Sequence, residues 1–192
     1  TEQTRLTSRL NVAVSKAGIF ALRLRIPEGF DVDSLSGDGV SHWDEVNGNT
    51  REVVVNFSRR VSGVISLNLV LSHSGRELGA QFPAPRIRME GALKHTGTLA
   101  ITAERGIRVT TQSRVGASEI LPRELGIRQK GSLAYRLLRP DWEIQLQSEV
   151  MDPQIKAEVL HRVVLSEGLM KIRSYVQYDI EHAGVKTFWL QP

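Results

Sequence analysis

The densest group of potentially reactive side chains is His42-Trp43-Asp44-Glu45, where a base, an aromatic ring and two carboxylates follow one another. Adjacent residues of a strand point to opposite faces, so His42 and Asp44 would share one face, and Trp43 and Glu45 the other. A histidine beside a carboxylate can act as a base with its orienting group. Because no Gly-x-Ser-x-Gly signature supplies a nucleophile, we expect Trp43 to anchor a core and the other three residues to lie at the surface.

The acidic segment Asp31–Gly39 is the nearest approach to a metal-binding loop. A calcium loop of the EF-hand type needs an oxygen ligand at its fifth position, glycine at the sixth and glutamate at the twelfth. These positions hold Leu35, Ser36 and His42. The segment is therefore interpreted as an acidic turn between strands, with a weak calcium site as the alternative.

The remaining histidines are isolated in the sequence, and they are His73, His95, His161 and His182. None of them has the close ligand spacing of a zinc motif. His161 interrupts an otherwise apolar face, which predicts a hydrogen-bonded core histidine. We therefore predict neither a metal site nor a cofactor.

Two tryptophans, Trp142 and Trp189, are candidate glycan-binding residues, because sugar rings stack on exposed aromatic faces. Core packing is the preferred interpretation of both, and a glycan platform is the alternative. Carboxylates for glycoside hydrolysis are defined by their separation in space, so the sequence cannot single them out. The available acidic residues are Glu90, Glu104, Asp141, Glu143 and Glu149.

Composition narrows the class of protein. The 192 residues are 41% hydrophobic and contain no cysteine, which predicts a folded core without disulfides or a zinc ribbon. The 25 basic residues, 19 of them arginine, are spread along many segments against 21 acidic ones, which favours solvated sheet faces over a nucleic-acid surface. No apolar run approaches the roughly 20 residues of a membrane span.

The dominant hydrophobic period is two, which is typical of half-buried strands. We predict an all-β fold, an antiparallel two-sheet β-sandwich with long strands and little or no helix, because the uneven strand lengths argue against a closed barrel. The segment Ser118–Gly126 is the best helix candidate, and it predicts a short turn or 3₁₀ segment. The inward-facing sets are Phe20, Leu22, Leu24 and Ile26; Ile65, Leu67, Leu69 and Leu71; Leu133, Tyr135 and Leu137; and Trp142, Ile144 and Leu146.

The last third of the chain carries two long alternating runs, at 155–165 and 170–180. Each would span roughly 36 to 43 Å at about 3.3 Å per residue, which exceeds the usual strand. Such a hairpin implies a broad or strongly bent sheet, with a bulge in at least one strand. Earlier turns are predicted at Ser62-Gly63 and at Glu104-Arg105-Gly106, the second joining an antiparallel pair, Thr98–Ala103 and Ile107–Thr111.

The end of the chain echoes its beginning. Val12-Ala13-Val14 leads through Ala17-Gly18 into an alternating run and a proline, and Tyr178-Asp179-Ile180 leads through Ala183-Gly184 into another. The offset is 183 − 17 = 166 residues. Both copies predict strand, Ala-Gly turn, strand. We expect residues 1–192 to be one β-rich unit cut from a larger repeating protein, with a sub-boundary at 82–85 that separates 1–82 from 83–192.

The stretch from Gly18 to Leu71 resembles the repeated β-rich segments of large bacterial cell-envelope proteins. The shared pattern runs from Phe20-Ala21-Leu22-Arg23-Leu24 through Pro27-Glu28-Gly29 to Trp43, Val53-Val54-Val55 and Gly63. The resemblance covers about a third of the chain and brings no functional residues with it. It implies an extracytoplasmic, multi-unit, non-catalytic protein.

These observations lead to one expected function and one alternative. The expected function is a non-catalytic structural or interaction module of a larger bacterial envelope or secreted protein, in the periplasm, at the cell surface or outside the cell. Its partners would be neighbouring β units, a cell-surface protein or a glycan, with no nucleic acid. The alternative is a carbohydrate-binding or carbohydrate-processing β-sandwich that uses Trp142 or Trp189.

Overall fold

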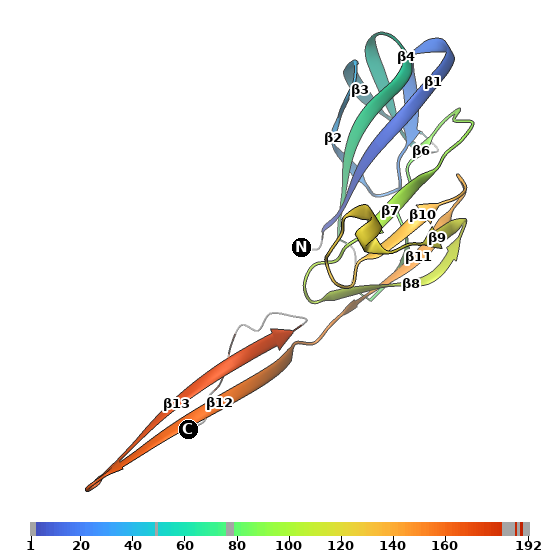
Figure 1. Cartoon of the computed structure of the whole chain (residues 1–192). Helices are drawn as coiled ribbons and strands as arrows, with labels where there is room; N and C mark the ends of the chain where they lie inside the picture. The colour runs from blue at the N-terminus through green and yellow to red at the C-terminus, as the bar shows by residue number, and fades with distance from the viewer. Residues whose placement is uncertain (1–2, 49, 76–78, 182–186, 188, 190–192) are drawn as a thin grey trace.

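The protein, seen in a computed structural model, is an all-β chain, and its described residues form thirteen strands and one short 3₁₀ helix (Figure 1). The structure describes residues 3–48, 50–75, 79–181, 187 and 189. The strands are β1 (Gln3–Arg25), β2 (Asp31–Gly37), β3 (Val40–Asn47), β4 (Arg51–Ser74), β5 (Gln81–Pro83), β6 (Arg88–Met89), β7 (Gly97–Ile101), β8 (Ile107–Val115), β9 (Ala117–Glu119), β10 (Leu133–Leu137), β11 (Glu143–Val150), β12 (Gln154–Ser166) and β13 (Leu169–Glu181). The prediction of an all-β fold with long strands and little helix is confirmed.

The strands form four antiparallel sheets. The largest has the order β2-β4-β1-β6, with β3 also paired to β4. Two three-stranded sheets follow, β7-β10-β9 and β5-β11-β8, and the fourth sheet is the β12-β13 hairpin alone. Several sheets, rather than the two of the predicted sandwich, therefore make up the described part of the chain.

The pairing of β1 with β4 organises the first sheet. Gln3 pairs with Ser74 and Arg25 pairs with Glu52, so one register holds at both ends of two very long strands. Between these ends the register shifts twice, around Ile19, and then returns. Figure 1 shows both strands curving over in this region, at the top of the picture. Extra residues in each strand thus bend the pair without separating it.

The predicted turns at Ala17-Gly18 and Ser62-Gly63 are wrong. Both lie inside continuous strands, because β1 keeps β4 as its partner on either side of them. Glycine is needed at position 18 for close approach: a Cβ there would lie 2.8 Å from the Val61 carbonyl oxygen. The second copy of this motif, at Ala183-Gly184, lies outside the described residues.

The first hydrophobic core is shared by both halves of the bent strands. Its buried residues are Val12, Leu22, Leu24, Ile26, Phe30, Leu35, Val53, Val55, Phe57, Val61, Ile65, Leu67, Leu69 and Leu71. The predicted inward set from Ile65 to Leu71 is confirmed. In the other predicted set, Leu22, Leu24 and Ile26 are buried, but the Phe20 side chain is 63% exposed. It lies where the register shifts, and its neighbour Ile19 packs on the core instead.

A second core forms between the two three-stranded sheets. It contains Ala84, Tyr135, Trp142, Ile144 and Leu146, with Leu133 and Leu137 packed against it. The inward sets predicted for β10 and β11 are therefore confirmed. The predicted pairing of Thr98–Ala103 with Ile107–Thr111 is wrong, because β7 pairs with β10 and β8 with β11. The connection between them is long enough to cross from one sheet to the other.

The predicted short 3₁₀ segment is confirmed as η1 (Pro122–Leu125). Proline occupies its first turn, and Gly126 closes it in the left-handed conformation, at φ 76°. The Glu124 carboxylate accepts a hydrogen bond from the backbone N–H of Leu121 at 3.2 Å.

The chain crosses between the two cores near residues 82–89. Phe82 and Ala84 pack in the second core, whereas Ile87 and Met89 return to the first. The predicted sub-boundary at 82–85 falls inside this crossing and stays a prediction.

The β12-β13 hairpin stands away from both cores (Figure 1). Thirteen consecutive residue pairs, from Gln154 with Glu181 to Ser166 with Leu169, follow one register without a shift. The predicted bulge and broad sheet are therefore wrong. A strand bulges where it must curve around a core or a neighbour, and among the described residues the sheet of this hairpin holds only its own two strands.

Truncation in the first core should weaken folding far more than truncation at the surface of the same strand. Leu67 is fully buried and Val64, three residues away in β4, is 72% exposed. Leu67→Ala should lower the free energy of unfolding by about 2 to 5 kcal/mol, because it leaves a cavity. Val64→Ala should change it by less than about 0.5 kcal/mol. Urea unfolding measures both, and equal losses would contradict the assigned core.

Candidate functional site

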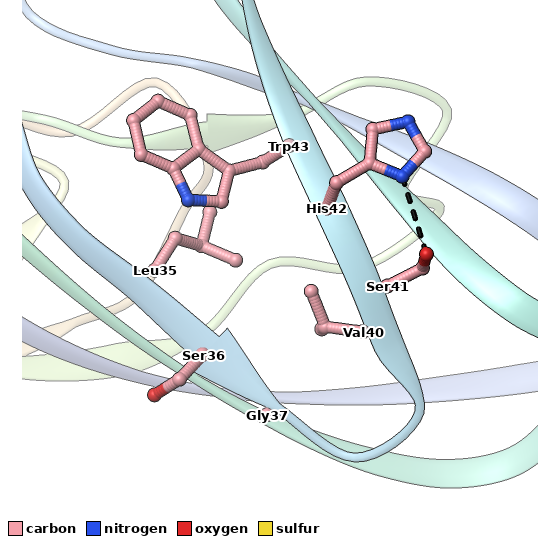
Figure 2. Close-up of a pocket in the computed structure, with 7 residues that line it drawn as sticks. All are labelled: Leu35, Ser36, Gly37, Val40, Ser41, His42 and Trp43. Carbon is pink, nitrogen blue, oxygen red and sulfur yellow. Dashed lines mark hydrogen bonds between the residues drawn. The ribbon is translucent and has the colours of Figure 1, made fainter.

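The first candidate site is a pocket of about 360 Å³ between the end of β2 and the start of β3. Figure 2 shows its lining, which is Leu35, Ser36, Gly37, Val40, Ser41, His42 and Trp43. β2 and β3 pair with opposite halves of β4, and Asp38-Gly39, with Gly39 at a positive φ of 72°, connects the two strands. The short turn holds the two walls of the pocket close together.

Trp43 and His42 leave β3 on opposite sides (Figure 2). Trp43 lies opposite the buried Val55 of β4 and packs against the first core while remaining partly exposed. The alternation in His42-Trp43-Asp44-Glu45 is therefore the one expected from the sequence. Because of this alternation, the Trp43 ring lines the pocket together with Ser36 and Ser41.

Ser41, His42 and Asp44 form a polar chain on the exposed side of β3. The Ser41 hydroxyl lies 3.2 Å from His42 Nδ1, and Asp44 Oδ2 lies 3.7 Å from His42 Nε2. Asp44 also accepts a hydrogen bond from Asn56 Nδ2 at 3.0 Å. Ser41 was not predicted from the sequence as part of this group, although it lies next to His42.

This polar chain lacks the surroundings that activate a serine nucleophile. The side chains of His42 and Asp44 are 62% and 61% exposed, so water screens the charges that would drive proton transfer. The order of contacts resembles that of a catalytic triad, but neighbours on one exposed strand gain no enclosed site for a developing oxyanion.

The acidic residues near the pocket each bind a different group. Asp33 accepts a hydrogen bond from the Ser72 hydroxyl at 2.6 Å, and Asp38 accepts one from the Ser66 N–H at 3.1 Å. The Glu45 carboxylate, 2.7 Å from Arg51, is the main cause of a raised pKa of that guanidinium. Residues 31–37 form a strand, so the predicted acidic turn is wrong. Within the described ranges no three metal-ligating side chains come together.

The predicted glycan residues lie in different surroundings. Trp142 is 5% exposed in the second core, with the Arg86 guanidinium 5.9 Å from the centre of its ring. Trp189 is 90% exposed. The carbohydrate role of these two residues stays a prediction, and the tryptophan that lines a pocket beside polar groups is Trp43.

The second candidate site is one side of the β12-β13 hairpin, which we call the hairpin face. Its side chains alternate along both strands and pair across them. The pairs are Ile155 with Ile180, Ala157 with Tyr178, Val159 with Val176, His161 with Ser174, Val163 with Ile172, and Leu165 with Met170. All but Ala157, Tyr178, His161 and Ser174 are large aliphatic side chains.

The aliphatic side chains of the hairpin face are exposed to water. Their exposure runs from 36% at Val176 to 75% at Leu165. The opposite side of the hairpin is mixed, with Lys156, Arg162 and Lys171 among a few apolar residues. The hairpin is therefore amphipathic without a core to cover its apolar side.

His161 interrupts the hairpin face near its middle. Its Nδ1 lies 2.8 Å from the Ser174 hydroxyl, its direct partner on β13. The predicted hydrogen bond is present, but the predicted burial is wrong, because the residue is exposed along with the whole strand. His161 and Ser174 therefore hydrogen-bond to each other within the hairpin face.

Comparison of the chain with protein-family models, with curated proteins and with solved structures gives no match. In the part of the chain that the structure describes, no helix is long and apolar enough to cross a membrane. Function must therefore be argued from the two candidate sites themselves.

The exposed Ser41 hydroxyl should react no faster than an ordinary serine. We expect a fluorophosphonate probe to leave the native protein unlabelled, because neither His42 nor Asp44 is desolvated. Mass spectrometry of the treated protein measures this, with an active serine hydrolase as the positive control. Stoichiometric labelling that disappears in Ser41→Ala would contradict the non-catalytic interpretation.

Proposed function

We propose that this chain is a non-catalytic structural and interaction module of a larger bacterial extracytoplasmic protein, and that the hairpin face is its contact surface for a neighbouring β unit. One observation carries the proposal: a long, regular hairpin presents to water a face of mostly aliphatic side chains, interrupted by the His161–Ser174 pair. The resemblance of Gly18–Leu71 to repeated envelope segments supports the location.

An uncovered hairpin of this kind is expected to need a partner. A two-stranded sheet on its own is marginally stable in water, since it buries little apolar surface. The hairpin face is about 40 Å long and about 10 Å wide, on the order of 400 Å² in projection. Apolar patches of this size on soluble proteins mark interaction sites. Covering the face would supply the burial that the hairpin lacks.

The occupant we infer is a second unit of the same kind. With the offset of 166 residues, the correspondence is Leu10 with Val176, Val12 with Tyr178, and Val14 with Ile180. In β1 all three of these positions pack in the first core. In β13 Val176 and Ile180 are 36% and 39% exposed and Tyr178 is half-buried, so the pattern is suited to packing against the inner face of another such sheet. In solution, a second copy of this chain can take the place of that second unit.

The bent first sheet is consistent with the sandwich expected from the sequence. Residues from both halves of β1 and β4 enter one core, with Val12 and Leu22 from the two ends of β1. We infer that the two halves act as the two layers of a sandwich, joined through the curved middle of the strands. This gives the module a rigid body from which the hairpin projects.

A charge placed on the hairpin face should weaken self-association. Val163 and Val164 are neighbours with similar exposure, 52% and 45%, on opposite sides of β12. Val163→Glu would bury an unpaired carboxylate and should weaken association at least about tenfold. Val164→Glu is the matched control, because its partner Lys171 can pair with the new charge.

Sedimentation equilibrium over about a hundredfold range of concentration measures this association. The wild type and Val164→Glu should form dimers, and Val163→Glu should shift towards monomer. A wild type that stays monomeric throughout, or equal weakening by both variants, would overturn the hairpin face as a contact for a second copy. Circular dichroism checks that both variants keep their strands.

Carbohydrate binding is the second candidate function, and one observation favours it. The partly exposed Trp43 ring lines a pocket with Ser36 and Ser41, an arrangement that suits a sugar ring stacked on indole. The candidate residue is then Trp43, with Trp142 and Trp189 as the residues indicated by the sequence.

Tryptophan fluorescence with a panel of neutral oligosaccharides tests this second function. Binding at the pocket should shift the emission of the wild type saturably, because the sugar displaces water from the Trp43 ring. Trp43→Phe should lose most of that shift, and Trp189→Phe should keep it. Unchanged emission with every sugar would contradict a glycan site at Trp43.

A further inference from the structure

A second pocket, of about 190 Å³, lies where the two cores adjoin. Its lining is Arg88, Met89, Ala92, His95, Pro140 and Asp141. Met89 belongs to β6 and packs against the first core, whereas Pro140 precedes Trp142 of the second. Three of the lining residues, Met89, Ala92 and Pro140, supply apolar walls. We call this cavity the Arg88 pocket.

Arg88 is a partly buried arginine whose guanidinium is not neutralised. Its Nε atom is buried and makes no hydrogen bond. Within the described residues no carboxylate lies in salt-bridge range of Arg88, whereas Arg25, whose Nε is likewise buried without a hydrogen bond, lies 2.9 Å from Glu90. Arg88 and Arg25 are also direct partners across β6 and β1. A buried donor of this kind normally has an acceptor.

Arg86 lies near the same space, and His95 is part of the lining. Arg86 is fixed in place, with Nη1 donating to the Trp142 carbonyl oxygen at 2.6 Å. Burial lowers the pKa of His95, and the nearby charges of Arg88 and Arg86 lower it further. The one acidic residue of the lining, Asp141, is mostly exposed and already lies 3.5 Å from Arg139. The interior of the pocket is therefore positive and short of an anion.

We propose that the Arg88 pocket binds the carboxylate group of a small acidic ligand. Arginine presents parallel N–H donors that match the two oxygens of a carboxylate, and Arg88, which lines the pocket, has no carboxylate partner within the described residues. His95 lies in the same lining and offers a further donor when its ring N–H faces the ligand. The apolar walls suit the uncharged part of a ligand no larger than a single sugar. This proposal is independent of the hairpin face.

The carboxylate could belong to a small free acid or to a sugar acid, and one titration experiment distinguishes these two kinds of ligand. Sodium acetate represents a small free acid, sodium glucuronate represents a sugar acid, and glucose is the neutral control. Each is added to the isotope-labelled full chain at constant ionic strength, while the NMR signals of His95 and Ala92 are followed. At least one carboxylate should move both signals saturably, and glucose should not. Tighter binding of glucuronate assigns the sugar acid, and tighter binding of acetate assigns the free acid.

Variants connect the binding to the pocket. Arg88→Gln should weaken carboxylate binding at least about tenfold. Arg105→Gln removes the same charge from an exposed turn and should leave binding unchanged. Ala92→Leu fills the pocket with Arg88 intact, so its loss of binding does not depend on the stability of the arginine variant.

Three results would overturn the proposal. The first is the absence of saturable shifts with both carboxylates, and the second is undiminished binding in both Arg88→Gln and Ala92→Leu. The third is tighter binding of inorganic phosphate than of either carboxylate, which would assign the pocket to a different class of anion.

Discussion

The antiparallel pairing of β1 with β4 is the interaction on which the rest of the fold depends. These strands are 23 and 24 residues long and keep one register at both ends. Strands of this length cannot stay flat around a small core, because twist accumulates along them. The register shifts around Ile19 allow the pair to bend, and the bend lets one pair of strands enclose the first core from both sides. β2 and β3 then pair with β4, and β6 pairs with β1.

The same physics explains why the β12-β13 hairpin is different. Its strands are 13 residues long against the 23 of β1 and share the apolar alternation of β1, but within the described chain the hairpin has neither a bulge nor a third strand. Its pairing satisfies the backbone, and its hydrophobic face remains in water. Burial of that face against an equivalent unit would remove the difference between β13 and β1. The proposed interaction role therefore rests on the exposed apolar side chains of the hairpin face and not on a specific sequence motif.

Alternation predicted which side chains share a face, but it did not predict what covers that face. The inward sets of β4, β10 and β11 were correct because hydrophobic period two fixes the faces of a strand. The predicted burial of Phe20 was wrong because the register shift around Ile19 changes which side chains face the core. The predicted turn at Ala17-Gly18 was wrong because the same residue types occur both in bent strands and in turns that reverse the chain. The predicted pairing of β7 with β8 was wrong, because which strands pair depends on segments that are distant in the sequence.

The candidate sites show the same limit. The opposite orientations of His42 and Trp43 followed from their adjacency, whereas the pocket depends on the approach of β2, which no local pattern encodes. Arg88 and His95 were invisible as a pair, because β6 and the segment after it meet Pro140 only through the contact between the two cores. The hairpin face was visible as a pattern, but its exposure was not.

Single-cysteine cross-linking tests the central claim most directly, because the chain has no cysteine of its own. Val159 lies on the hairpin face, and Leu160 lies beside it on the opposite side, both half exposed or more. If the hairpin faces meet between two copies, Val159→Cys should form a disulfide-linked dimer rapidly under mild oxidation and Leu160→Cys should not. Equal, slow cross-linking at both positions would contradict the account.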